Sequence, residues 1–228
     1  MVQLNFKKMR VAFQGEPGAF SEAAAVQLLG EGIQTIPRAT FDAAFRAIAD
    51  GAADALLVPV ENTLAGSVVR VYDLLLESPL EICGETILPI EHHLMGCPET
   101  TFAQIRAVAS HPMALAQCER FFEQNPALKR VPAEDTAGSV REMMDRGEKS
   151  CAAIAGRRAA GHYGAIILRE NIEDNAELPI HITAAGTHLE LRMHGGATSA
   201  IEVGVFVLEV LRDHGQFILR LLLCYAGP

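Results

Sequence analysis

The chain has 228 residues, of which 50% are hydrophobic and 21% are charged, and its formal net charge at pH 7 is −9. This length predicts one large domain or two small lobes with a buried core, and the composition excludes a disordered chain. Nucleic-acid binding needs clustered positive charge, and the sequence contains only four lysines, so we expect no nucleic-acid partner. Helix ends and a few arginines can still bind a small anion.

The cysteines and the chain ends indicate the compartment. The five cysteines are scattered and form no Cys-x-x-Cys pair, which favours neither a disulfide framework nor a metal site. The N-terminal residues lack the apolar core of a signal peptide. Residues 217–225 are apolar but are interrupted by Arg220 and are too short to span a bilayer. We therefore expect a reduced, soluble, cytoplasmic protein without a membrane segment.

The first third of the chain alternates short strands with short helices. Strands are predicted over 9–13, 33–36 and 55–60. Helices are predicted from an N-cap at Ser21 to Gly30, from an N-cap at Thr40 to Gly51, and from about 68 to 76.

The alternation continues after a long β-prone run over 81–94, which we expect to cross from one lobe to the other. Strands are predicted over 105–109, 130–133 and 150–155. Helices are predicted over 112–124, with Ser110 as the N-cap, over 137–146, with Thr136 as the N-cap, and near 156–161. Strands and helices of these lengths predict an α/β fold with mostly parallel sheets.

The pattern changes from Leu178 onward. Residues 188–193 alternate as a strand would, and residues 200–211 are apolar with Gly204 inside them. Two glycines and the apolar run 217–223 favour poor packing in this segment.

Four points in the sequence share one design, in which a strand ends in small polar residues and a helix begins. They are Gly15–Ser21, Glu61–Ser67, Ser110–Gln117 and Glu134–Ser139. Because the carboxyl ends of parallel strands share one edge of a sheet, several of these turns can converge on a carboxylate-bearing ligand. The alternative is that Ser21, Ser110 and Thr136 are simply N-caps, each contributing about 1 kcal/mol. The four together, with Asn62 and Gln117, favour a site.

Three histidines, at positions 92, 93 and 111, are candidates for a chemical role. His111, between Ser110 and Pro112, suits a general acid or a structural hydrogen bond, and we favour the structural role. His92 and His93 are expected to point to opposite faces of one strand, which makes a metal site improbable. No nucleophile elbow, P-loop or Gly-x-Gly-x-x-Gly motif is present.

Several ordered motifs together resemble the prephenate dehydratase family, which includes the arogenate dehydratases. They are Gln14-Gly15-Glu16-Pro17-Gly18-Ala19-Phe20-Ser21, Val58-Pro59-Val60-Glu61-Asn62-Thr63, Pro89-Ile90-Glu91-His92-His93, Ser110-His111-Pro112 with Gln117, and Asp135-Thr136-Ala137. The resemblance covers about residues 9–177.

The resemblance implies a catalytic domain of two α/β lobes similar to type II periplasmic binding proteins, with a first lobe over about 9–88 and a second over about 89–177. It implies a lyase that converts prephenate to phenylpyruvate without cofactor or metal, in phenylalanine biosynthesis, and a homo-oligomer. Carried over by position, Asn62, Ser110 and Gln117 are the implied catalytic residues. Glu61, Glu134, Thr136 and Ser21 are the implied binding or supporting residues.

The C-terminal part departs from the family. The family's Asn-x-Thr-Arg-Phe segment, whose threonine is catalytic and whose arginine binds substrate, is expected after residue 177, but this chain reads Leu178-Pro179-Ile180-His181-Ile182-Thr183. The signatures of the regulatory ACT domain are also missing from 178–228. We therefore expect weak or no turnover, with arogenate dehydratase or a non-catalytic ligand-binding protein as alternatives.

Overall fold

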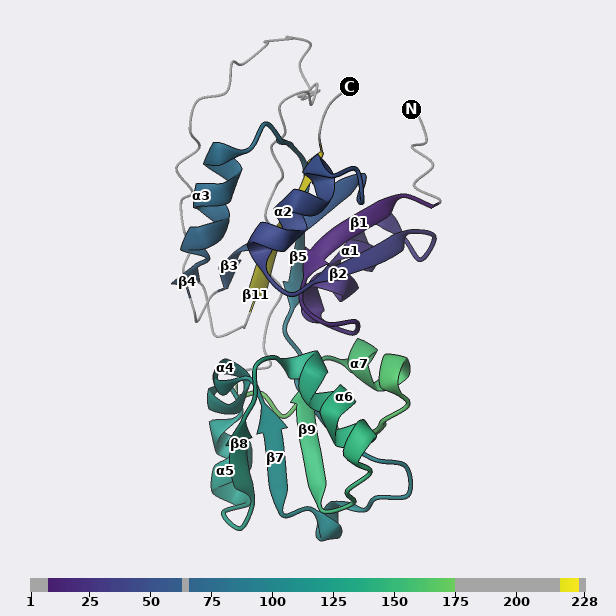
Figure 1. Ribbon diagram of the computed structural model, residues 1–228. Coiled ribbons are helices and arrows are strands. Elements are labelled where there is room, and N and C mark those ends of the chain that lie inside the picture. Colours follow the sequence, from purple (N-terminus) through teal and green to yellow (C-terminus); the bar gives the residue numbers. More distant parts are fainter. Residues whose placement is uncertain (1–7, 63–65, 175–217, 226–228) are drawn as a thin grey trace, which may run out of the picture.

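The computed structural model describes residues 8–62, 66–174 and 218–225, which form two α/β lobes with one sheet each (Figure 1). The first sheet has the strand order β2-β1-β3-β11-β5, with the short β4 paired to β3. The second sheet has the order β10-β6-β9-β7-β8. The predicted two-lobed α/β architecture is therefore confirmed.

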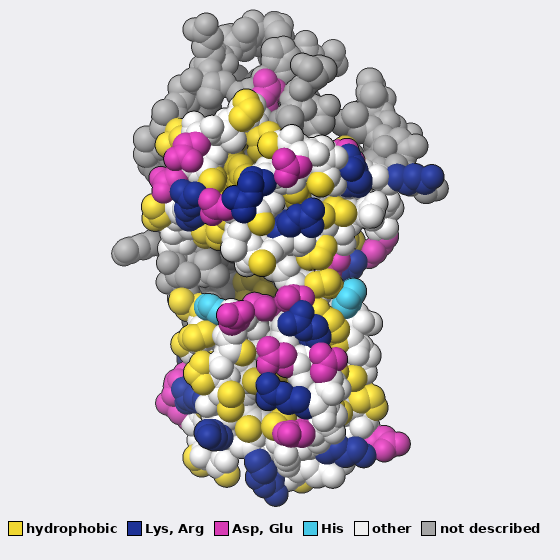
Figure 2. Space-filling view, viewed as in Figure 1, with side chains coloured by type: hydrophobic (Ala, Val, Ile, Leu, Met, Phe, Trp, Pro, Cys, Tyr) yellow, Lys and Arg dark blue, Asp and Glu magenta, His cyan; other side chains and the backbone are white. Residues whose placement is uncertain are grey.

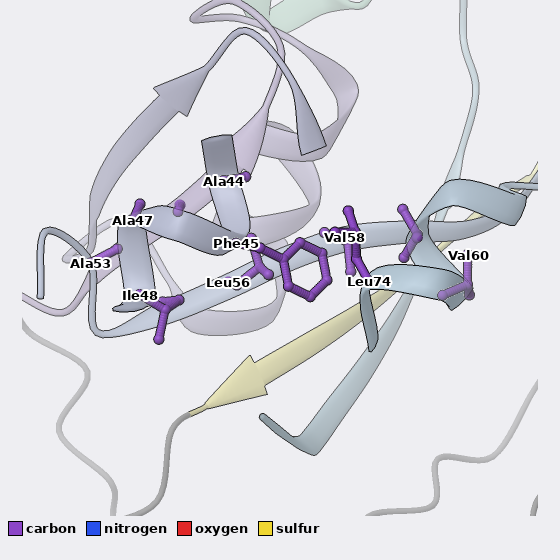
Figure 3. Close-up of a cluster of buried hydrophobic side chains, with 11 residues drawn as sticks. Ala44, Phe45, Ala47, Ile48, Ala53, Leu56, Val58, Val60 and Leu74 are labelled. Carbon is purple, nitrogen blue, oxygen red and sulfur yellow. The ribbon is translucent and has the colours of Figure 1, made fainter. Parts of the chain in front are cut away.

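The first lobe begins with three parallel strands, of which β1 and β3 are buried on both faces. Its parallel strands β1 (Arg10–Gln14), β2 (Gln34–Arg38) and β3 (Ala55–Asn62) alternate with α1 (Phe20–Leu29) and α2 (Phe41–Ala49). Leu56 and Val58 of β3 point to α2 and α3 (Val69–Glu77), where they pack with Phe45 and Leu74 (Figure 3). Ala55 and Leu57 pack with α1 on the other face.

The strand β11 (Ile218–Tyr225) lies inside the first sheet rather than at its edge. It runs antiparallel to β3 on one side and to β5 (Glu81–Pro89) on the other, so that Leu223 is paired with both Leu57 and Gly84. The backbone of 218–225 is therefore paired on both sides, and the poor packing expected of this tail stays a prediction. The strand and apolar segment expected over 188–193 and 200–211 lie outside the described residues.

The predicted run 81–94 is two strands, because the chain leaves one sheet and enters the other. Strand β5 ends at Pro89 in the first sheet, and β6 (His93–Gly96) begins the second. Residues 90–92 make the crossing, as expected of a segment that connects two lobes.

The second lobe combines a parallel unit with two antiparallel strands. Strand β7 (Ala107–Ser110) is parallel to β8 (Lys129–Pro132) and to β9 (Cys151–Ala155), whereas β6 is antiparallel to β9 and to β10 (Ile166–Arg169). One face packs on η1 (Phe102–Gln104), α4 (Pro112–Ala116) and α5 (Glu119–Gln124). The other face packs on α6 (Thr136–Arg146) and α7 (Arg157–Tyr163).

Three of the four predicted N-caps are wrong. Thr40 does cap α2, and its Oγ1 accepts a hydrogen bond from the Ala43 amide at 3.1 Å. Helix α1 begins one residue before Ser21, with Ala19 as its N-cap. His111 Nδ1, not Ser110, accepts from the Met113 amide, and the Asp135 carboxylate, not Thr136, accepts from Gly138. A carboxylate one residue earlier is a strong acceptor for the free amides of a helix start.

The predicted helix over 112–124 is broken at Gln117 and Cys118 into α4 and α5. The break frees the amides of Glu119 and Arg120, and each donates to the Asp174 carboxylate at 2.9 Å. Local sequence could not show this, because Asp174 lies more than 50 residues away along the chain.

The segment between β1 and α1 packs directly on the second lobe. Gly18 has φ +88°, and a Cβ at this position would lie 2.7 Å from the Cα of Ala159. The Glu22 carboxylate lies 3.2 Å from Arg158, and Glu16 lies 2.7 Å from Arg141.

None of the helices in the described part of the chain has the length and apolar character that a membrane crossing requires.

Candidate functional site

The carboxyl ends of the parallel strands in the second lobe point toward the first lobe (Figure 1). Strand β7 ends there at Ser110, and β9 ends at Ala155 next to the start of α7. The surface narrows where the two lobes meet (Figure 2). Strand ends of this kind, with polar residues and helix starts, are where open α/β sheets bind ligands.

Gln117 lies at the break between α4 and α5 and is 3% exposed. Its Oε1 is 2.6 Å from Nε2 of His92, a residue that sequence analysis did not place in the site. The rings of His92 and of Phe20 in the first lobe pack edge to face, with their centroids 5.6 Å apart. The site therefore includes a buried polar pair that lies against both lobes.

Hydrogen bonds of the His92 and Gln117 backbones link this pair to the residues that follow Asn171. The His92 amide donates to the Glu173 carboxylate at 2.7 Å, and the Asp174 amide donates to the Gln117 carbonyl at 2.8 Å. Burial raises the pKa of Glu173. Burial also lowers the pKa of His92 to about 4, so that its ring is neutral at pH 7.

Ser110 is fully buried at the end of β7 and does not cap the next helix. Its hydroxyl donates to the Ile154 carbonyl of β9 at 2.7 Å. Because that hydrogen is used, the free lone pairs of the oxygen can only accept from a ligand.

Glu61 and Asn62 end β3 in the first lobe and are partly buried. In the sheet they are paired with Ser67 and Gly66 of β4 and, on the other side, with positions 220 and 219 of β11. Glu134 is exposed, and it follows β8 in the second lobe, so the implied supporting residues Glu61 and Glu134 come from different lobes.

The structure also places the other residues that the sequence analysis named. Thr136 is the first residue of α6 and is partly buried, and Ser21 is buried in the first turn of α1. His111 is exposed and caps α4, which confirms its structural interpretation. His93 accepts from the Asn171 amide at 3.2 Å, away from the partner of His92. Within the described residues, no group of three or more His, Cys, Asp or Glu is arranged to hold a metal ion.

The sequence and the structure both have known relatives. The family model described as prephenate dehydratase matches residues 11–178. A protein from Arabidopsis thaliana named arogenate dehydratase/prephenate dehydratase 1, chloroplastic, is 42% identical over 168 residues, which are 74% of this chain and 42% of the relative. The chain thus spans about two fifths of the length of this curated relative.

Solved structures share the fold, and two of them are similar to this chain over most of its length. One is GqqA, described as a novel type of quorum quenching acylase, with a TM-score of 0.74 and 30% identity over 96% of this chain and 64% of that one. The other is the prephenate dehydratase of Arthrobacter aurescens in complex with L-Phe, with a TM-score of 0.72 and 24% identity over 96% of this chain and 61% of that one.

Proposed function

Because the chain belongs to the prephenate dehydratase family, we propose that it catalyses the decarboxylating dehydration of prephenate to phenylpyruvate, on the route to phenylalanine. The observation that carries the proposal beyond family membership is the buried Gln117 amide. Its Nε2 is buried without a hydrogen-bond partner among the described residues, at the strand ends between the lobes. A buried amide hydrogen without an acceptor is costly, so this group suits a ligand oxygen.

The reaction needs little from the protein. The bond between the ring and its carboxylate breaks to release carbon dioxide, its electron pair enters the ring, and the ring hydroxyl leaves as water after taking one proton. Aromatisation drives the step, so the protein must hold a dianion, stabilise developing charge and allow protonation of the leaving hydroxyl. In this proposal Asn62, Ser110 and Gln117 bind and orient the substrate, supported by Glu61, Glu134, Thr136 and Ser21.

Turnover is expected to be weak, because the Thr-Arg-Phe element is missing from the sequence. Loss of a principal catalytic donor lowers a rate by about 10²- to 10⁴-fold. The test is to incubate the full chain with prephenate and to measure phenylpyruvate against a no-enzyme control and against Asn62→Ala. Slow formation that the substitution abolishes supports the proposal, and a rate equal to the control in both samples contradicts it.

A second candidate is arogenate dehydratase, which the name of the Arabidopsis relative favours. Parallel assays with arogenate, measuring phenylalanine, decide between the two substrates through their kcat/KM values. If prephenate binds saturably but neither substrate reacts, the chain is a non-catalytic binding protein on the same scaffold.

The proposal also includes a cytoplasmic homo-oligomer. Among the described residues, the three cysteines Cys97, Cys118 and Cys151 are free thiols, which suits a reducing compartment. Light scattering of the purified chain tests the assembly, and a monomer over the whole concentration range would contradict it.

A further inference from the structure

His92 is held in one place by contacts on three sides. Its amide donates to Glu173, its ring packs against Phe20, and its Nε2 lies 2.6 Å from the Oε1 of Gln117. The side chain is 1% exposed. A ring held in this way keeps its Nε2 next to the Gln117 side chain.

The contact with Gln117 determines which ring nitrogen of His92 carries the proton. An amide oxygen only accepts hydrogen bonds, so the ring must donate from Nε2. The reverse arrangement, in which the amide nitrogen of Gln117 donates to Nε2, would move the ring proton to Nδ1. Nδ1 is buried and has no partner among the described residues, so that arrangement would bury an N–H donor there and would turn the amide oxygen, not the NH₂ group, toward a bound anion, whereas a ligand oxygen can satisfy the NH₂ group of the first arrangement. Burial keeps the ring neutral at pH 7, which leaves one proton to place.

The same contact determines the orientation of Gln117. With Oε1 bound to His92, the NH₂ group is directed away from the ring, and its nitrogen is buried without a partner among the described residues. The main chain of Gln117 is held as well, because its backbone N–H donates to the Met113 carbonyl and its backbone carbonyl accepts from the Asp174 N–H. The NH₂ group is therefore presented in a fixed direction.

We propose that His92 is a positioning residue, which donates from Nε2 to Gln117 and so presents the Gln117 NH₂ group to an oxygen of the bound dianion. This role rests on the proposed dehydratase function for the identity of the ligand. His92 itself touches no substrate. Without its donor, the Gln117 amide is free to rotate and to present its oxygen, which repels a carboxylate.

The first test needs no turnover. Long-range ¹H–¹⁵N spectra of the unliganded chain at pH 7 report which nitrogen of each histidine is protonated, and His92→Gln identifies the signal of residue 92. We expect the proton on Nε2. A proton on Nδ1 would overturn the proposal whatever the activity of the chain.

The second test measures the dissociation constant of prephenate by calorimetry in three variants. His92→Phe keeps the aromatic ring but removes the donor, and a lost hydrogen bond to a buried group predicts about 5- to 30-fold weaker binding. His92→Gln keeps an N–H donor at a similar reach, and should bind within about 3-fold of the parent chain. His93→Phe is the matched control, because His93 is equally buried and bonds to Asn171 instead.

The outcomes separate a positioning role from a structural one. If His93→Phe weakens binding as much as His92→Phe, or if His92→Phe leaves it unchanged, the proposal is wrong. The melting temperatures of the variants show that each one is folded, and if His92→Phe is not, the His92→Gln result and the spectra still decide. If the parent chain fails to bind prephenate, the proposed function fails, while the spectra test the His92–Gln117 geometry independently.

Discussion

The two lobes obtain their sheets in different ways. All strands of the second sheet come from one stretch of chain, from His93 to Arg169. The first sheet needs β11, which is separated from β5 in the sequence by the whole second lobe. The second lobe is therefore self-contained, whereas the completeness of the first lobe depends on distant residues. The candidate site draws on both, and each prediction below tests this contrast.

The largest effect is expected from truncation after Asp174, which removes β11 and leaves β3 and β5 with unpaired edges. The first lobe should lose more than about 4 kcal/mol of stability, beyond the range of ordinary single substitutions. Hydrogen exchange followed by mass spectrometry measures the lobes separately. Equal protection of β1–β3 in the full and truncated chains would show that the contrast between the lobes is wrong.

Acid should weaken the contacts of His92 at the start of the second lobe. The folded pKa of His92, about 4, is below its unfolded value of about 6.5, so between these values the unfolded chain binds more protons. Its contribution to stability is present above pH 6.5 and decreases as the pH falls toward 4, by about 3 kcal/mol in total. Denaturant unfolding at several pH values measures this, and His92→Gln should remove that part of the slope. Burial also lowers the pKa of His93, and this contribution remains in the variant.

A substitution at Gly18 tests how closely the lobes are packed together. In Gly18→Ala the new Cβ would lie 2.7 Å from the backbone of Ala159, in addition to the cost of a positive φ. We expect a loss of about 2 kcal/mol in thermal or denaturant unfolding. Gly51→Ala is the matched control, since its φ is +66° but no atom lies within 4 Å, and it should cost only about 1 kcal/mol. Equal losses would mean that the lobes do not pack as described.

The smallest effect is expected at an exposed ion pair of the second lobe. Lys149 lies 3.1 Å from Glu99, whose side chain is 84% exposed. Glu99→Gln should change the free energy of unfolding by less than about 0.5 kcal/mol. A larger change would indicate that the second lobe depends on its surface charges as well as on its core.

Local sequence patterns were sufficient for most elements but not for the contacts between distant residues. The buried strand at the continuous apolar run 55–60 and the N-cap at Thr40 were predicted correctly, because both depend on neighbours within a few positions. The break after Ala116 and the capping of α5 by Asp174 were missed, because they depend on contacts across more than 50 residues. The motif resemblance indicated Gln117, but the role of His92 emerged only when Nε2 was seen 2.6 Å from the amide oxygen.

The central position of β11 has a consequence for synthesis on the ribosome. The second lobe can fold as soon as residue 174 has left the ribosome. Strands β3 and β5, in contrast, lack the strand that pairs between them until residues 218–225 follow. At about 5–20 residues per second, this leaves the two strand edges exposed for seconds in the nascent chain. Open edges invite pairing with other chains, so the first lobe should need chaperone protection during this interval more than the second.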